Sequence, residues 1–90
     1  MSFPKILDNA SVLYYAPENY YGEVCYTTGE PAEHIRYLAI CKYENDTVYC
    51  LFGCNAELEV VSDSPWESIE KCKRVAEASY GCVISWIAIK

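Results

Sequence analysis

The stretch IRYLAICKYENDTVYCLFGCNAELEVVSD, residues Ile35–Asp63, decides the fold of this 90-residue chain. Runs of β-branched and aromatic residues alternate there with the turn sequences END and NA, which predicts three strands. We place these strands at Ile35–Tyr43, Thr47–Cys54 and Glu57–Ser62. Because the connections are too short for a parallel crossover, we expect an antiparallel meander.

The first two strands of this meander are apolar on both faces. Alternate residues of a strand point to opposite faces. In the first strand, one set is Tyr37, Ala39, Cys41 and Tyr43 and the other is Leu38 and Ile40; in the second, Val48, Cys50 and Phe52 oppose Tyr49 and Leu51. Both faces therefore need cover, and one helix covers only one of them. For the other face the sequence leaves four candidates: the N-terminal strand, the long loop, the C-terminal tail or a partner.

A helix follows the meander in SDSPWESIEKCKRVAEASYG, residues Ser62–Gly81. Ser64 is the expected N-cap, with Pro65 at the first helical position and Glu67 completing a capping box. Gly81 is expected to end the helix. The apolar positions recur every three or four residues and predict a buried stripe made of Trp66, Ile69, Cys72, Ala76 and Tyr80.

The remaining segments predict one strand at each end of the chain. SVLYYAP, residues Ser11–Pro17, reads as a short strand, and CVISWIAIK after the helix reads as a final strand or extended tail. Residues 18–34 form a long connection. The expected fold is a single α+β domain over residues 1–90, in which an antiparallel sheet of the meander plus N- and C-terminal strands carries one C-terminal amphipathic helix on one face.

The net charge of −6 is distributed unevenly along the chain. Nine acidic residues lie between Glu18 and Asp63 against only Arg36 and Lys42, whereas acidic and basic residues balance in the predicted helix. This surplus argues against binding to a nucleic-acid backbone and favours a basic protein partner. No stretch is apolar over the length needed to span a membrane and no signal peptide is recognisable, so we expect a cytoplasmic protein without membrane contact.

Neither a metal site nor a catalytic site is expected. The six cysteines, at positions 25, 41, 50, 54, 72 and 82, contain no Cys-x-x-Cys pair, and we expect free thiols packed as small apolar residues. Cys50 and Cys54 share a strand face about 13 Å apart, too far to share an ion. His34, the only histidine, is expected to be exposed and solvated. We therefore predict no cofactor and no enzymatic activity.

Acidic and aromatic residues of the strand region are the candidate partner-binding residues. Glu57 and Glu59 are expected to share one strand face about 6.6 Å apart. Glu44 and Asp46 lie in the first turn of the meander. These carboxylates fit either a plain solvated surface or a docking surface for Lys and Arg. Tyrosines of the long connection, namely Tyr20, Tyr21 and Tyr26, fit either aromatic anchors or ordinary loop packing.

Residues Tyr37–Gly81, half of the chain, resemble a group of small bacterial immunity proteins found beside polymorphic and contact-dependent growth inhibition toxins. The similarity lies in an apolar strand that runs into an acidic turn (LAICKYEND), a Tyr/Phe-rich strand (VYCLFGCN), a strand ending in SD, and the helix SIEKCKRVAEASYG followed by SW. The abundance of cysteine in this chain is a departure from the family pattern, and it leaves the redox behaviour open.

The resemblance implies a protein that neutralises a cognate toxin by direct binding. A toxin that cleaves nucleic acid presents a basic active-site cleft, which a small acidic domain can occupy in place of the substrate phosphates. The implied roles are as follows: Glu44, Asp46, Glu57 and Glu59 contact the cations, Glu30 and Glu33 are rim charges, and Tyr20 and Tyr21 are buried anchors. The alternative is a non-catalytic accessory or regulatory subunit of a cytosolic complex, and a homodimer formed through an edge strand also stays open.

Overall fold

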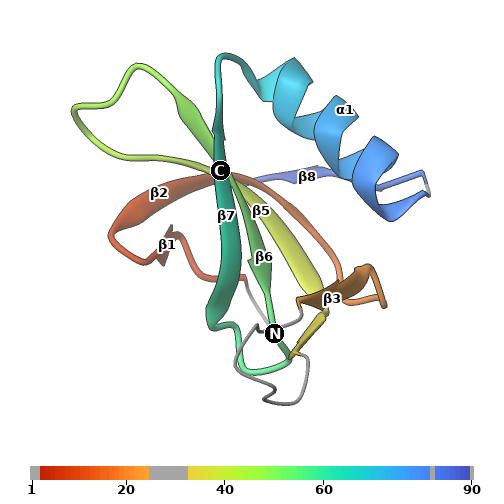
Figure 1. Cartoon of the computed structure of the whole chain (residues 1–90). Coiled ribbons are helices and arrows are strands. Elements are labelled where there is room, and N and C mark those ends of the chain that lie inside the picture. Colours follow the sequence, from red (N-terminus) through yellow and green to blue (C-terminus); the bar gives the residue numbers. More distant parts are fainter. Residues whose placement is uncertain (1–2, 25–32, 82, 90) are drawn as a thin grey trace.

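A computed structural model describes residues 3–24, 33–81 and 83–89 (Figure 1). Its elements in chain order are β1 Ile6–Leu7, β2 Ala10–Ala16, β3 Gly22–Val24, β4 Glu33–Ile35, β5 Tyr37–Lys42, β6 Tyr49–Cys54, β7 Val60–Trp66, α1 Ile69–Tyr80 and β8 Ile87–Ala88. The main sheet is antiparallel in the order β1-β2-β5-β6-β7, with β8 paired to β2, while β3 and β4 form a separate hairpin. The predicted α+β class is confirmed. In the described ranges no helix is long and apolar enough to cross a membrane.

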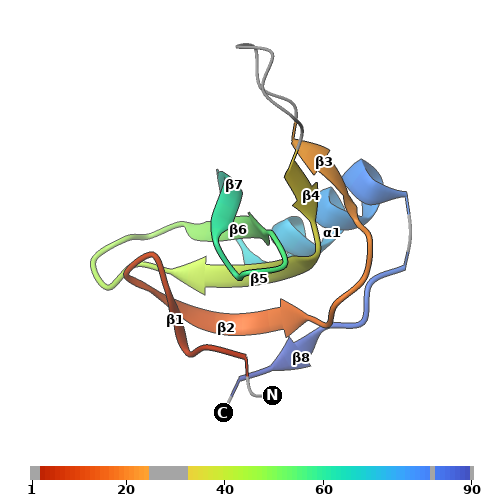
Figure 2. The same ribbon diagram turned by 90° about the horizontal axis from the view of Figure 1, so that it is seen from below.

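The central meander is confirmed as β5, β6 and β7. Ile40 lies opposite Leu51 in the first pair, and Leu51 lies opposite Ser64 in the second. The N-terminal strand, predicted at Ser11–Pro17, is β2, and it borders β5. The C-terminal strand is short and lies along the outer edge of β2. The first and last strands, β1 and β8, therefore both pair with β2, as Figure 2 shows.

Two separate cores occupy the two faces of the sheet, as the doubly apolar strands predict. The buried residues of the first core are Phe3, Leu7, Ala10, Val12, Ala39, Cys41, Cys50, Phe52 and Cys54. Those of the second are Ala16, Tyr21, Ile35, Leu38, Ile40, Leu51, Cys72, Ala76 and Ile84. The helix supplies Cys72 and Ala76 to the second core, so α1 covers that face (Figure 1). The first core lies within the curl of the sheet.

Phe3 and Leu7 cover the first core from a segment in which the sequence predicts no strand, since the predicted N-terminal strand is β2 of the sheet itself. Of the four covers left open by the sequence, the C-terminal tail contributes Ile89, which packs against this core. Asp8 and Asn9 have φ values of 51° and 68°, which is the backbone of a tight two-residue hairpin turn. This turn folds β1 back onto β2 and buries Leu7. Phe3 stacks on Tyr15 with ring centroids 4.5 Å apart. The chain therefore covers both faces of its own sheet.

The helix begins four residues later than the sequence predicts. Ser64, Pro65 and Trp66 belong to β7, where Trp66 lies opposite Tyr49. The N-cap is Ser68, whose Oγ accepts a hydrogen bond from the backbone N–H of Lys71 at 3.0 Å. The pairing of β7 with β6 extends the strand through the predicted cap. Pro65 is tolerated because β7 is the outer strand of the sheet.

The end of the helix agrees with the prediction. Gly81 adopts the left-handed conformation with φ 68°, and its N–H donates to the carbonyl of Glu77 at 2.9 Å. Ile69, Cys72, Ala76 and Tyr80 all face the second core. Trp66 also reaches this core, but from β7.

The predicted strand Ile35–Tyr43 is divided at Arg36, which corrects the prediction of one continuous strand. The N–H of Arg36 donates to the carbonyl of Cys54 at 2.7 Å, and its carbonyl accepts from the N–H of Asn19 at 3.0 Å. Before Arg36 the chain pairs with β3, and after it the chain pairs with β2 and β6. Ile35 packs over Gly53, where an added Cβ would lie 3.2 Å from the Ile35 side chain. The base of the β3–β4 hairpin is therefore held against β6.

Candidate functional site

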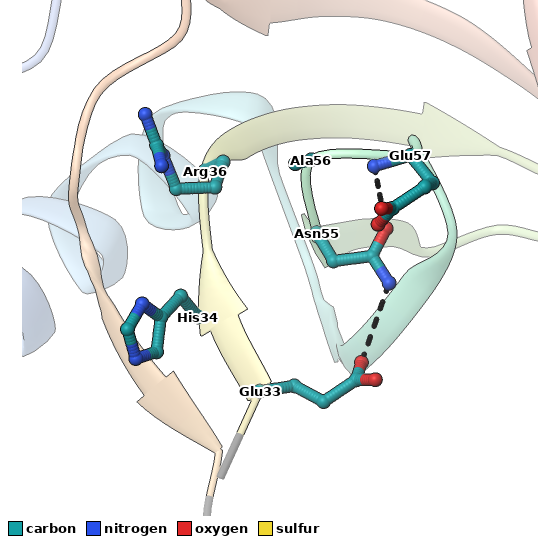
Figure 3. A pocket seen from close by; sticks show the side chains of 6 residues that line it. All are labelled: Glu33, His34, Arg36, Asn55, Ala56 and Glu57. Carbon is teal, nitrogen blue, oxygen red and sulfur yellow. Dashed lines mark hydrogen bonds between the residues drawn. The ribbon is translucent and has the colours of Figure 1, made fainter.

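The buried side chain of Asn55 organises the turn between β6 and β7. Its Oδ1 accepts hydrogen bonds from the backbone N–H groups of Glu57 and Glu59, at 3.1 and 2.9 Å. Its Nδ2 donates to Glu59 Oε1 at 2.9 Å. It also donates to Glu33 Oε2 at 3.4 Å, a bond that Figure 3 shows. Asn55 is only 7% exposed, so these bonds replace those that water would otherwise make.

This turn corrects the predicted strand Glu57–Ser62. Glu57 and Glu59 lie in the turn, and β7 begins only at Val60. Leu58 between them has a φ of 63°, so the two carboxylates do not follow the alternation of a strand. The reason is local, because the Asn55 amide captures N–H groups that would otherwise join the ladder. Both carboxylates are exposed.

The β3–β4 hairpin brings a third carboxylate to this turn. Glu33 lies at the start of β4 and accepts the longer of the two bonds from Asn55 Nδ2. An open hollow of about 260 Å³ lies between hairpin and turn, lined by Glu33, His34, Arg36, Asn55, Ala56 and Glu57 (Figure 3). Three of the predicted binding residues, Glu33, Glu57 and Glu59, are therefore brought together. We call these three carboxylates with Asn55 the Asn55 surface.

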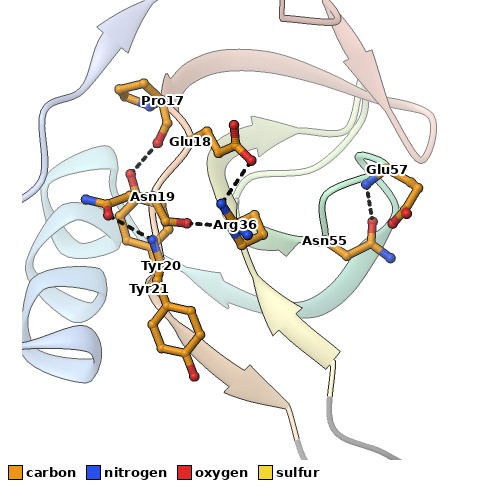
Figure 4. Close-up of polar contacts among 8 residues, drawn as sticks. All are labelled: Pro17, Glu18, Asn19, Tyr20, Tyr21, Arg36, Asn55 and Glu57. Carbon is orange, nitrogen blue, oxygen red and sulfur yellow. Dashed lines mark hydrogen bonds and ion pairs between the residues drawn. The ribbon is translucent and has the colours of Figure 1, made fainter.

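Arg36 fixes the segment that precedes the hairpin (Figure 4). Its Nη2 forms an ion pair with Glu18 at 3.1 Å, and its Nε donates to the carbonyl of Asn19 at 3.0 Å. The next residue, Tyr20, is 53% exposed, and its ring meets the ring of His34 edge-on at 5.2 Å. Tyr20 is therefore an exposed aromatic side chain that packs on His34, whose ring points away from Asn55 (Figure 3).

Tyr21 does not match its predicted role as a partner anchor. It is 7% exposed and belongs to the second core, where its ring lies 6.2 Å from that of Tyr80. Its hydroxyl donates to the carbonyl of Pro17 at 2.6 Å (Figure 4). The contacts explain the difference, because Tyr21 packs on Tyr80 whereas the ring of Tyr20 lies against His34. Tyr21 matches the alternative that the sequence also left open for these tyrosines, which is ordinary packing of the long connection.

Glu44 and Asp46 lie apart from the Asn55 surface. They occupy the connection that precedes β6, whereas the Asn55 turn follows this strand. The six residues of β6 separate the two acidic groups by about 17–20 Å. The side chains of Glu44 and Asp46 are exposed and make no hydrogen bond or ion pair with the described residues. The four carboxylates predicted to contact cations therefore form two groups. Glu30 and Tyr26 lie outside the described residues.

The described thiols are buried and unionised. Cys41, Cys50, Cys54 and Cys72 are free. Burial raises the pKa of the Cys41 thiol to about 12, and burial raises those of Cys54 and Cys72 to about 11. The thiolate needed for nucleophilic attack is therefore scarce near neutral pH. Cys25 and Cys82 lie outside the described residues.

Asn55 is the residue that sequence reasoning missed. The sequence NA predicts a turn, and Asn in a turn commonly accepts a hydrogen bond from the backbone N–H two residues later. That rule predicts the bond to Glu57. The bond to Glu33 joins residues 22 positions apart, and no local pattern indicates it.

Comparison of the chain with profiles of known families, with curated proteins and with solved structures finds no significant match. The site is therefore interpreted from its own geometry. Within the described ranges no three His, Cys, Asp or Glu residues are grouped to hold a metal ion. The arrangement can instead offer three carboxylates from two segments to a cationic partner.

Proposed function

We propose that this chain is an immunity protein that binds and neutralises a cognate bacterial toxin. One observation supports this function above others: Glu33, Glu57 and Glu59 are gathered around the buried amide of Asn55. Grouped carboxylates suit a partner surface rich in Lys and Arg. The resemblance of Tyr37–Gly81 to immunity proteins points in the same direction.

The proposed mechanism is competition for a basic cleft. A toxin that cleaves nucleic acid must hold phosphates with cationic side chains, and these cations also attract carboxylates. The Asn55 surface enters that cleft and excludes the substrate. Glu44 and Asp46 lie at the other end of β6, so they act at a distance, by raising the rate of association. No covalent step is required.

The accessory-subunit alternative loses the feature that suggested it. That alternative was based on strands that are apolar on both faces of the sheet. The helix covers one face, so a partner could cover the other. Phe3 and Leu7 cover the first core, and the helix covers the second. An immunity protein that is stable before it meets its toxin fits such a self-contained fold better.

Co-expression tests the proposal. The chain is expressed with the C-terminal domain of the large secreted protein encoded immediately upstream, and growth and co-purification are scored. We expect growth to be rescued and a stable complex to be recovered. Absence of rescue, or co-purification with a non-toxic host protein instead, would overturn the proposed function.

A further inference from the structure

The amide of Asn55 bonds to two segments that are far apart in the sequence. Its oxygen accepts hydrogen bonds only from the turn, from the N–H groups of Glu57 and Glu59. Its nitrogen serves both the turn, through Glu59, and the β3–β4 hairpin, through Glu33. The hydrogen bonds of one neutral side chain thus join two carboxylates that would otherwise repel each other.

The chemistry of this position is demanding. A side chain here must accept two hydrogen bonds with one atom and donate two with another, which a primary amide can do. An Asp would keep the acceptor but would place a third carboxylate against Glu33 and Glu59. An apolar residue would leave the two backbone N–H groups of the turn without an acceptor.

We infer that Asn55 is a positioning residue, which couples the β3–β4 hairpin to the β6–β7 turn so that the carboxylates of both meet the partner as one preorganised surface. The nature of that partner rests on the proposed function. The coupling itself belongs to the free chain and is measurable there. Held in advance, the carboxylates lose less freedom on binding, which strengthens the complex.

Two variants separate the two halves of the amide. Asn55→Asp keeps the oxygen that accepts the two backbone bonds of the turn and removes the donor that bonds to Glu33 of the hairpin and to the Glu59 side chain. Combining it with Glu33→Gln reverses the direction of the bond, because the Gln amide can donate to the Asp carboxylate. This double variant also has the same net charge as the wild-type chain. A recovery of the hairpin in it therefore reports the hydrogen bond and not the charge.

Amide hydrogen exchange of the full chain without any partner is the test. In Asn55→Asp we expect the hydrogen-bonded backbone amides of the β3–β4 hairpin to exchange about tenfold faster, since a hydrogen bond to a charged group is lost, while those of Glu57 and Glu59 change less. In the double variant the hairpin amides should return toward the wild-type rate. Unchanged hairpin exchange in Asn55→Asp, or no recovery in the double variant, would overturn the inference.

Glu33→Ala keeps the test decisive if Asn55→Asp does not fold. It removes the bond from the hairpin side and leaves the turn untouched, so the hairpin amides alone should exchange faster. Glu57→Ala is the matched control, because it removes one carboxylate of the same surface whose side chain does not bond to Asn55. Equal hairpin exchange in these two variants would contradict the coupling. Failure of co-expression rescue would instead overturn the proposed function alone, since exchange needs no toxin.

Discussion

Two acidic residues lie at each end of strand β6, but only the two after the strand lie in a turn that side-chain hydrogen bonds hold in place. Before the strand, Glu44 and Asp46 are exposed and their side chains bond to none of the described residues. After it, Glu57 and Glu59 flank a turn that Asn55 holds by four side-chain hydrogen bonds, one of them to the hairpin residue Glu33. The two ends carry the same number of carboxylates. Only the end after β6 is held by hydrogen bonds as a defined surface.

This difference indicates how each end can contribute to binding. Loose charges attract a basic partner from a distance, and salt screens their effect. Charges held in fixed positions can pair closely with cations after contact and so slow dissociation. Acidic residues of one chain can therefore divide these two tasks between them.

Charge reversal of the Asn55 surface should have the largest effect. We expect Glu57→Lys with Glu59→Lys to weaken the complex with the toxin about 100-fold or more, because close charge pairs become repulsions. Growth rescue should be lost with it. Affinity and both rate constants are measured by surface plasmon resonance.

Reversal at the other end is the matched control, since Glu44→Lys with Asp46→Lys changes the net charge equally. We expect it to slow association about threefold to tenfold at low salt, with dissociation little changed. If this variant lost more affinity than the first, the assignment of tasks to the two ends would be reversed.

Asn55→Asp distinguishes the effect of the added negative charge from the effect of releasing the hairpin. Charge alone predicts tighter binding to a basic toxin, because a carboxylate is added. Positioning predicts binding about tenfold weaker, because the hairpin is released. The sign of the change, measured by calorimetry, decides between the two explanations. Tighter binding would contradict a role for order at this end.

Alkaline pH should destabilise the sheet at β6, the strand that joins the two ends, and at its neighbour β5. The thiols of Cys41 and Cys54 have pKa values near 12 and 11 in the folded chain, against an ordinary 9.0. Between these values the unfolded chain releases protons that the folded chain keeps. The free energy of unfolding therefore falls as pH rises above 9, by about 1.4 kcal/mol per pH unit for each such thiol. Urea denaturation at several pH values measures it, and Cys41→Ala should give a shallower slope. A slope that stays flat above pH 9 would contradict the buried thiols.

The smallest expected effect distinguishes the thiols at the two ends of β6. Burial chiefly raises the pKa of Cys50, and the nearby charges of Asp46 and Asp63 add to it, whereas burial alone raises that of Cys54. We therefore expect Asp46→Asn to lower the pKa of Cys50 and to leave that of Cys54 unchanged. Titration of the ¹³Cβ shifts by NMR measures both. Equal pKa shifts at Cys50 and Cys54 would contradict this, because they would show that the charge of Asp46 acts on both ends of β6.

The sequence predicted the sheet because its strongest signal is local. Alternating apolar residues in β5 and β6 fixed both the strands and the existence of two cores, and the helix stripe and Gly81 followed from spacing. The helix start was wrong because Ser64 and Ser68 both resemble caps. Pairing of Trp66 with Tyr49 decides between them, and this is a contact between distant residues.

The candidate site was predicted only in part, for the same physical reason. Glu33, Glu57 and Glu59 were named for their charge, yet their meeting depends on Asn55, whose bond to Glu33 spans 22 residues. Tyr20 and Tyr21 have equivalent chemistry in the sequence. Only the packing of Tyr21 against Tyr80 separates a core residue from a surface one.

An NMR titration of the ¹⁵N-labelled chain with a catalytically inactive toxin domain tests the central claim most directly. The account predicts that the largest amide shifts fall in the Asn55 turn and β4, at Glu33, His34, Asn55, Glu57 and Glu59, with residues 43–48 little affected. Shifts concentrated at residues 43–48 or along α1, with the Asn55 turn unchanged, would contradict it.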